Sequence, residues 1–220
     1  MSKSRGFLPL LAAGLAVGLA AGCGNNASPG LSRGTELYDT CRPCHGNNGG
    51  GNELLAAPAI AGLPRWYVVE QLTKFKGSLR GVHPDDMEGH RMRPMALTLN
   101  HPGDVESVAE YVSKMSRVLP AHSLPGGDVA AGQEKYNSVC IACHGADGTG
   151  MEALKSPWLS GQYDWYLYSQ LRKFQSGMRG AHPQDITGGQ MRAMAMTLEN
   201  DAAVRNVVAY IRTLKAQGSH

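Results

Sequence analysis

Two short stretches, CRPCH at residues 41–45 and CIACH at residues 140–144, determine how this chain of 220 residues is organised. They lie 99 positions apart, and about thirty of the 75 positions from 41 to 115 are identical at that offset, without a gap. Such agreement at one constant spacing indicates a duplicated domain. The matched residues include Pro58 and Pro157, Gly62 and Gly161, Trp66 and Trp165, Tyr67 and Tyr166, Arg80 and Arg179, and Tyr111 and Tyr210.

Each copy is predicted to be helical, because its apolar residues recur at helical spacing and no stretch alternates as a strand would. The class is therefore all-α. We expect a leader at 1–22, a tether at 23–32, a first domain at 33–119, a turn-forming linker at 120–127 and a second domain at 128–220. The recurring apolar positions are Val68, Leu72 and Phe75 with Leu167, Leu171 and Phe174, and Val105, Val108 and Val112 with Val204, Val207 and Ile211.

The first 22 residues have the pattern of an export signal. Lys3 and Arg5 precede an apolar run at 7–21, which is shorter than the roughly 20 residues that a membrane span needs. The run ends in small residues before Cys23, which resembles a bacterial lipobox with Ala20 where leucine is commonest. The pattern predicts lipidation of Cys23. The alternative is a plain secreted protein in which Cys23 has no role.

The composition excludes nucleic acid as a partner and favours a bound cofactor. The net charge is +3, and two of the positive charges lie in the leader, so the remainder is close to neutral. Nucleic-acid binding would need a basic stripe, which this sequence lacks. Aromatic residues make up only 6% of the chain, so two small domains would have modest cores unless a cofactor fills their centres.

The CxxCH motif is the attachment pattern of c-type haem. Two thiols three residues apart, Cys41 with Cys44 and Cys140 with Cys143, can each form a thioether with one haem. The adjacent histidine, His45 or His144, can then bind the iron. The alternatives are a zinc site, which needs four ligands per metal, and a redox-active CxxC disulfide, which needs no histidine.

A sixth iron ligand is expected from methionine, since a His/Met pair raises the reduction potential. Each copy has two candidates in what we predict to be a short loop before the last helix. These are Met92 and Met95 in the first copy, and Met191 and Met194 in the second. The matched His83 and His182 are the alternative, and would give bis-histidine haems of lower potential.

At these residues the chain resembles the diheme class I cytochromes c, specifically the cytochrome c4 family, over residues 30–216. The resemblance implies two tandem domains, each wrapped around one covalent haem c. It favours Met92 and Met191 as ligands, because each lies seven residues before a leucine.

The resemblance also implies that the carbonyls of Pro58 and Pro157 accept a hydrogen bond from the ligand histidines. Candidate donors to the haem propionates are Tyr67, Tyr166, Trp66, Trp165, Arg80 and Arg179, and the pair Gly34 and Gly132 would allow the first helix to pack on Tyr111 and Tyr210.

These features predict an electron-transfer protein, not an enzyme, on the periplasmic side of a bacterial membrane. It would pass electrons by outer-sphere transfer from a quinol-oxidising complex to a haem-copper oxidase, and it would bind no small-molecule substrate. One alternative is a fixed subunit of a larger membrane oxidoreductase, which the near-neutral charge favours. A diheme peroxidase is a further alternative, but it would need a haem with a vacant or displaceable ligand.

Overall fold

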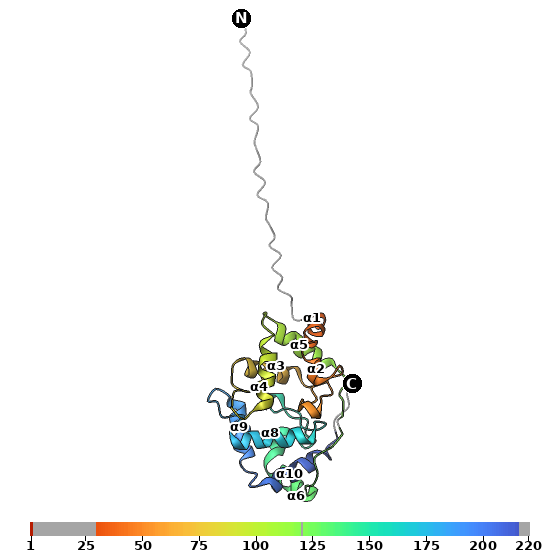
Figure 1. Cartoon of the computed structure of the whole chain (residues 1–220), viewed down its shortest axis with the longest axis vertical. Helices are drawn as coiled ribbons and strands as arrows, with labels where there is room; N and C mark the ends of the chain where they lie inside the picture. Colours follow the sequence, from red (N-terminus) through yellow and green to blue (C-terminus); the bar gives the residue numbers. More distant parts are fainter. Residues whose placement is uncertain (2–29, 120, 216–220) are drawn as a thin grey trace.

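The computed structural model describes Met1 and residues 30–119 and 121–215, which form two lobes, one for each copy of the repeat (Figure 1). The predicted leader beyond Met1, the predicted lipidation site Cys23 and most of the predicted tether lie outside the described residues. In the described part, no helix is long and apolar enough to cross a membrane.

The described backbone is helical, as predicted. It contains no β-strand, and its only β-type pairings are two isolated bridges, Asn52 with Ala57 and Met151 with Ser156. The first lobe contains α1 (Leu31–Tyr38), α2 (Arg42–His45), the 3-10 turn η1 (Glu53–Leu55), α3 (Arg65–Lys76), α4 (Met87–Leu97) and α5 (Asp104–Lys114). The second contains α6 (Val129–Lys135), the π-helical turn η2 (Tyr136–Cys140), α7 (Ile141–His144), the 3-10 turn η3 (Glu152–Leu154), α8 (Asp164–Ser176), α9 (Ile186–Ala195) and α10 (Asp201–Ile211).

The first and last helices of each lobe cross closely because each contact is made at a glycine. A Cβ atom on Gly34 of α1 would lie 2.2 Å from the Ser107 carbonyl oxygen of α5 and 2.8 Å from the Tyr111 Cβ. Gly132 of α6 lies against α10 in the same way, with a Cβ position 1.9 Å from the Asn206 carbonyl oxygen. The close packing expected for this glycine pair is therefore present in both lobes.

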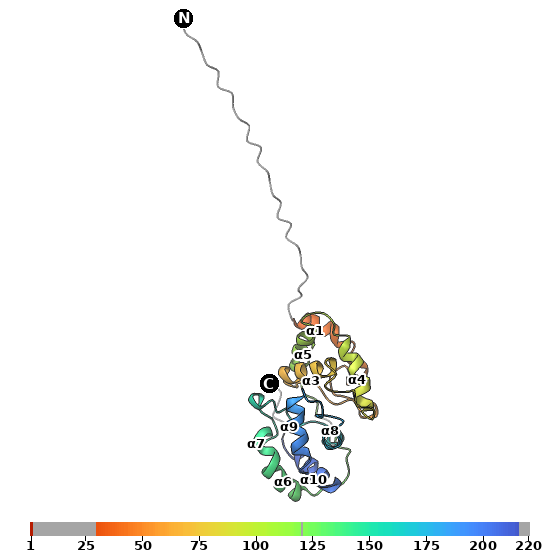
Figure 2. The ribbon, with the colours of Figure 1, turned by 90° about the vertical axis from the view of Figure 1, so that its left-hand side faces the viewer.

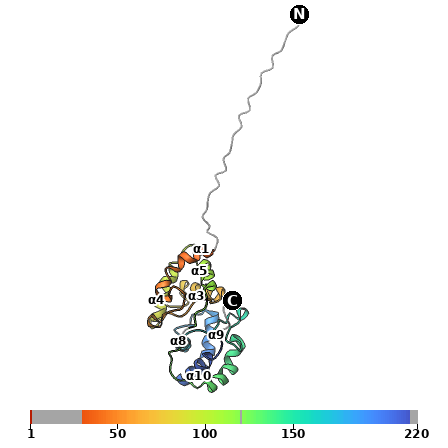
Figure 3. The ribbon, with the colours of Figure 1, turned by 90° about the vertical axis from the view of Figure 1, so that its right-hand side faces the viewer.

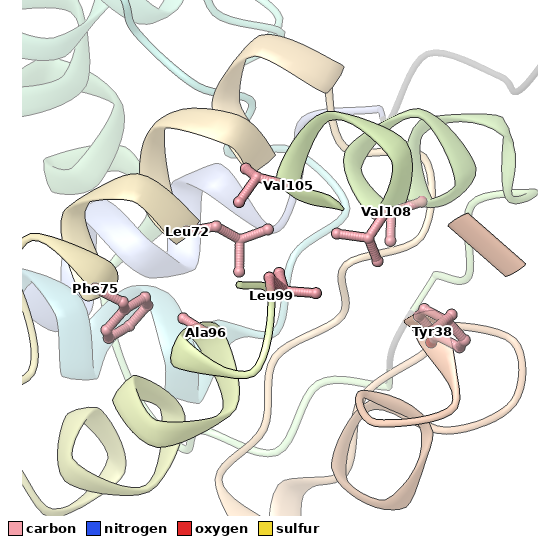
Figure 4. Packing of buried hydrophobic residues seen from close by; sticks show 8 residues of the cluster. Tyr38, Leu72, Phe75, Ala96, Leu99, Val105 and Val108 are labelled. Atoms are coloured by element: carbon pink, nitrogen blue, oxygen red, sulfur yellow. The ribbon is translucent and has the colours of Figure 1, made fainter. Parts of the chain in front are cut away.

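The core of the first lobe is formed where three helices converge. Figure 4 shows Leu72 and Phe75 of α3, Ala96 of α4, and Val105 and Val108 of α5 pointing toward a common interior. The second lobe has an equivalent cluster built from α8, α10 and the chain leading into α10. The apolar positions recognised from helical spacing are the ones that face these cores.

The methionine segments form helices, and our expectation of short loops was wrong. Asp86 starts α4 by accepting a hydrogen bond from the Gly89 amide at 3.1 Å, and Asp185 starts α9 through Gly188 at 3.0 Å. A capping aspartate outweighs the weak helix propensity of the residues that follow it. Glycines in both copies, and Pro94 in the first, hid these helices from a reading of the sequence.

The two lobes pack against one another through the middle of the molecule. Figures 2 and 3 show α1 and α5 at one end of the molecule and α6 and α10 at the other, with α3, α4, α8 and α9 between them. Arg179, which follows α8, donates a hydrogen bond to Gln71 of α3 at 2.9 Å, and Arg80, which follows α3, donates one to Gln170 of α8 at 3.0 Å. The predicted linker runs between α5 and α6, where Ser123 and Leu124 donate their amides to the buried Asp164 carboxylate.

We predict that Gly34→Ala destabilises the protein by about 2 kcal/mol, because the new methyl group collides with backbone that cannot move aside cheaply. Chemical denaturation of the purified protein measures the change. Gly189→Ala is the matched control, since Gly189 also lies inside a helix but has its nearest neighbour 3.8 Å from the Cβ position. The control should be neutral or stabilising by up to about 1 kcal/mol. Equal stability of the two variants would contradict the close crossing.

Candidate functional site

The two CxxCH histidines are buried and hold the same hydrogen bond. Nδ1 of His45 lies 2.9 Å from the Pro58 carbonyl oxygen, and Nδ1 of His144 lies 3.0 Å from that of Pro157. A carbonyl oxygen only accepts, so Nδ1 carries the proton and Nε2 keeps a free lone pair. Burial lowers the pKa of both imidazoles, against the opposing effect of the proline carbonyls. Each ring is therefore neutral and oriented, the state in which an imidazole can bind a metal through Nε2.

The four motif cysteines form no disulfide bonds, and in each lobe the pair lies about one helical turn apart beside the histidine. Burial raises the pKa of Cys41 to about 11, and that of Cys140 likewise to about 11. Among the described residues, no group of three or more His, Cys, Asp or Glu side chains is arranged to hold a metal ion.

The methionines lie on one face of α4 and α9. Met92 is half-buried and packs against the core of the first lobe, whereas Met95, one turn further on, is 39% exposed. In the second lobe Met191 is half-buried and Met194 is 43% exposed. Burial favours Met92 and Met191, although both members of each pair line the cavity described next.

One continuous cavity of about 1070 Å³ runs through both lobes. Its wall is mainly apolar, and neither His83 nor His182 belongs to it, which weighs against bis-histidine coordination. The predicted haem-binding residues of both copies line it together: Cys41, Cys44, His45, Met92, Met95, Cys140, Cys143, His144, Met191 and Met194.

The proposed propionate contacts form a network between the lobes. Arg80 bonds to Gln71 in its own lobe and to Tyr166 and Gln170 in the other. Arg179 makes the reciprocal contacts with Gln170 and Gln71. Burial alone would raise the pKa of Tyr166, but the two guanidinium groups together lower it below the usual value. This concentration of positive charge at the cavity wall suits carboxylate groups.

The two tryptophans are not equivalent, although the repeat predicted that they would be. Trp165 lines the shared cavity, and its buried indole Nε1 has no hydrogen-bond partner among the described residues. Trp66 lies instead in a separate pocket beside Met151 and Trp158 of the second lobe. The lobes are therefore related by an approximate symmetry only.

Sequence reasoning missed a second set of contacts between the lobes, involving Lys74, Lys173, Asp86 and Asp185. Lys74 bonds to Asp185 at 2.8 Å, and Lys173 bonds to Asp86. A signal was present, because polar residues recur at i, i+4 and i+7 on α3 and again on α8. These positions are Tyr67, Gln71 and Lys74, and Tyr166, Gln170 and Lys173.

Comparison with known proteins gives a consistent result. Residues 31–116 and 129–215 each match the Cytochrome c family. The thiosulfate dehydrogenase electron acceptor of Thiomonas intermedia (strain K12) is 30% identical over 181 residues, 78% of this chain and 77% of that protein. Cytochrome c4 of Thiocapsa roseopersicina is 29% identical over 185 residues, 79% of this chain and 86% of that protein. Reduced recombinant cytochrome c4 from Pseudomonas stutzeri shares the fold, with a TM-score of 0.65 and 24% identity over 86% of this chain and 100% of that one.

Two such domains in tandem hold two covalently attached haem c groups. The cavity fits these groups on three grounds. It has paired thiols and an oriented imidazole in each lobe, and its wall is mainly apolar. The Trp165 indole also lacks a hydrogen-bond partner that a propionate oxygen would supply. A buried N–H without an acceptor is costly, which makes this orphan a specific indication of a missing partner.

We predict that Trp165→Phe lowers the reduction potential of the second haem by about 20 mV. Removing a donor leaves more negative charge on a propionate, which stabilises the ferric state. A spectroelectrochemical titration that resolves the two haems measures the shift. Trp66→Phe is the matched control and should leave both potentials unchanged, because Trp66 does not line the cavity. Equal shifts in the two variants would contradict the assignment.

Proposed function

This chain belongs to the cytochrome c family, and we propose that it carries electrons from a quinol-oxidising complex to a haem-copper oxidase. The observation that supports this most is the pairing, in each lobe, of a buried histidine with a half-buried methionine across one cavity. We infer a carrier and not an enzyme, because two protein ligands per iron would leave no position for a substrate.

The chain's own residues have separable roles in this proposal. Cys41, Cys44, Cys140 and Cys143 attach the haems, whose iron supplies the one-electron change. His45 and His144 bind through Nε2 and are held in place by the proline carbonyls. Met92 and Met191 complete the coordination, and a thioether ligand favours a high reduction potential. Coordination by the same residues in both oxidation states keeps the structural change on electron transfer small.

The continuous cavity supports electron exchange between the two halves. Both sets of proposed haem-binding residues line it. The hydrogen bonds of Arg80 and Arg179 with Gln71 and Gln170 join the two lobes beside it. One molecule would thus accept an electron at one lobe and release it from the other.

A second candidate concerns the donor. The relative from Thiomonas intermedia is named as the electron acceptor of a thiosulfate dehydrogenase, and it covers 78% of this chain. The donor of the present chain would then be a dehydrogenase that oxidises an inorganic sulfur compound. Stopped-flow reduction of the oxidised protein distinguishes the two donors. Rapid reduction by quinol with membranes supports the first donor, and rapid reduction by thiosulfate with a soluble extract supports the second.

We also propose that the protein is exported and is held on the periplasmic side of a membrane by a lipid on Cys23. This proposal is supported by the lipobox-like sequence before Cys23. Cys23→Ser should move the protein from the membrane fraction to the soluble periplasmic fraction, because one cysteine carries the whole anchor. Equal fractionation of the variant and the native protein would contradict the anchor.

Replacing Met92 and Met191 together by leucine should abolish the far-red iron–sulfur charge-transfer band and lower both potentials, since a strong thioether ligand is lost. Visible spectra of the purified oxidised protein measure the band. The matched control is the double replacement Met95→Leu with Met194→Leu, which changes exposed methionines on the same helices and should retain the band. Loss of the band in the control alone would show that we chose the wrong methionine of each pair.

A further inference from the structure

Each lobe holds the methionine helix of the other lobe through a buried lysine. Lys173 of α8 contacts the Asp86 carboxylate and lies 2.7 Å from Oε2 of Glu88, both at the start of α4. Lys74 of α3 lies 2.8 Å from Oδ1 of Asp185, at the start of α9. The two contacts are related by the repeat, because Lys74 corresponds to Lys173 and Asp86 to Asp185.

The two lysine–aspartate contacts are enclosed, whereas the Glu88 side chain is 42% exposed. The side chains of Lys173 and Lys74 are 12% and 11% exposed, and those of Asp86 and Asp185 are 3% and 2% exposed. A surface ion pair contributes little, but removing one partner of a buried pair leaves an uncompensated charge in the interior. Each lysine is therefore coupled to the position of its aspartate.

Each aspartate is in turn rigidly joined to its helix. Asp86 caps α4 through the Gly89 amide, and its Oδ2 lies so close to Gly89 that a Cβ there would be 2.2 Å away. Asp185 sits over Gly188 in the same way, with a corresponding distance of 2.0 Å. Neither carboxylate can shift without moving the first turn of its helix.

The helix links the position of the aspartate to that of the methionine. Met92 lies six residues beyond Asp86, a distance of roughly 9 Å along an α-helix. Pro94 lies inside α4 and lacks the amide hydrogen that would bond to the preceding turn. The C-terminal half of α4 is weakened by this loss, so the anchored N-terminal end has the larger part in placing Met92.

We propose that Lys173 is a positioning residue for Met92 and that Lys74 is a positioning residue for Met191, so that the docking of the lobes controls axial ligation in both. This inference rests on the proposed His/Met ligation. Its distinctive feature is that it is crossed: a lysine in one lobe affects the haem of the other.

The test is an imidazole titration of the full-length oxidised diheme protein, since imidazole competes with a methionine ligand. Loss of the iron–sulfur band is followed, and NMR signals of the ligand methyl groups are assigned to each lobe with Met92→Leu and Met191→Leu. Lys173→Met should raise the imidazole affinity of the first lobe about tenfold and leave the second unchanged. Lys74→Met should give the opposite pattern.

Three further variants make the result decisive. Arg172→Met is the matched control and should alter neither site, because Arg172 neighbours Lys173 but, among the described residues, its side chain hydrogen-bonds to Gln175 of its own helix. Lys173→Arg keeps the charge and should restore near-native affinity. Asp86→Asn keeps a capping side chain while removing the charge, so it tests the pair even if Lys173→Met fails to fold.

Two kinds of result would overturn the inference, and they are distinguishable. If the methionine variants abolish the assigned signals, the crossed positioning is wrong, while the ligation stands, when each lysine variant changes its own lobe, both lobes equally or neither, or when Asp86→Asn leaves the first lobe unchanged. If replacing Met92 and Met191 together by leucine keeps the band, then the proposed ligation fails and the inference fails with it.

Discussion

The structure depends on the cavity of about 1070 Å³ that its two lobes share. Neither lobe has enough large side chains to fill its own centre, and each leaves an apolar space beside its CxxCH histidine. Joining the two spaces brings both sets of proposed haem-binding residues to the wall of one cavity. The helices that form this wall must then be held in position by contacts with one another.

The interface between the lobes does this with polar contacts and not with a second apolar core. Gln71 and Lys74 of α3 contact Arg179 and Asp185 of the second lobe. Their repeats on α8, Gln170 and Lys173, contact Arg80 and Asp86 of the first lobe, so the same set of contacts is made twice. Duplication explains why such a contact is self-complementary, because a surface that pairs with its copy satisfies both partners at once. The departures from symmetry are local, as in the different surroundings of Trp66 and Trp165.

The fold class and the family resemblance could be predicted because the CxxCH motif, the constant spacing of the repeat and the apolar periodicity can all be read directly from the sequence. The Gly34 crossing and the hydrogen bond from His45 to Pro58 followed from the resemblance, and the structure contains both. The helical form of α4 was not predicted, because one capping aspartate outweighs several weak helix formers. The bond between Lys74 and Asp185 joins residues far apart in the sequence, and no local pattern specifies such a partner.

A redox titration of the purified native protein, followed by visible spectroscopy, tests the central claim most directly, which is that two His/Met haems carry electrons without binding a substrate. The ligation proposed here predicts two one-electron steps, low-spin spectra throughout, and an iron–sulfur band in the oxidised protein that accounts for both haems. A high-spin five-coordinate haem in either oxidation state, or rapid reaction of the reduced protein with peroxide, would contradict it.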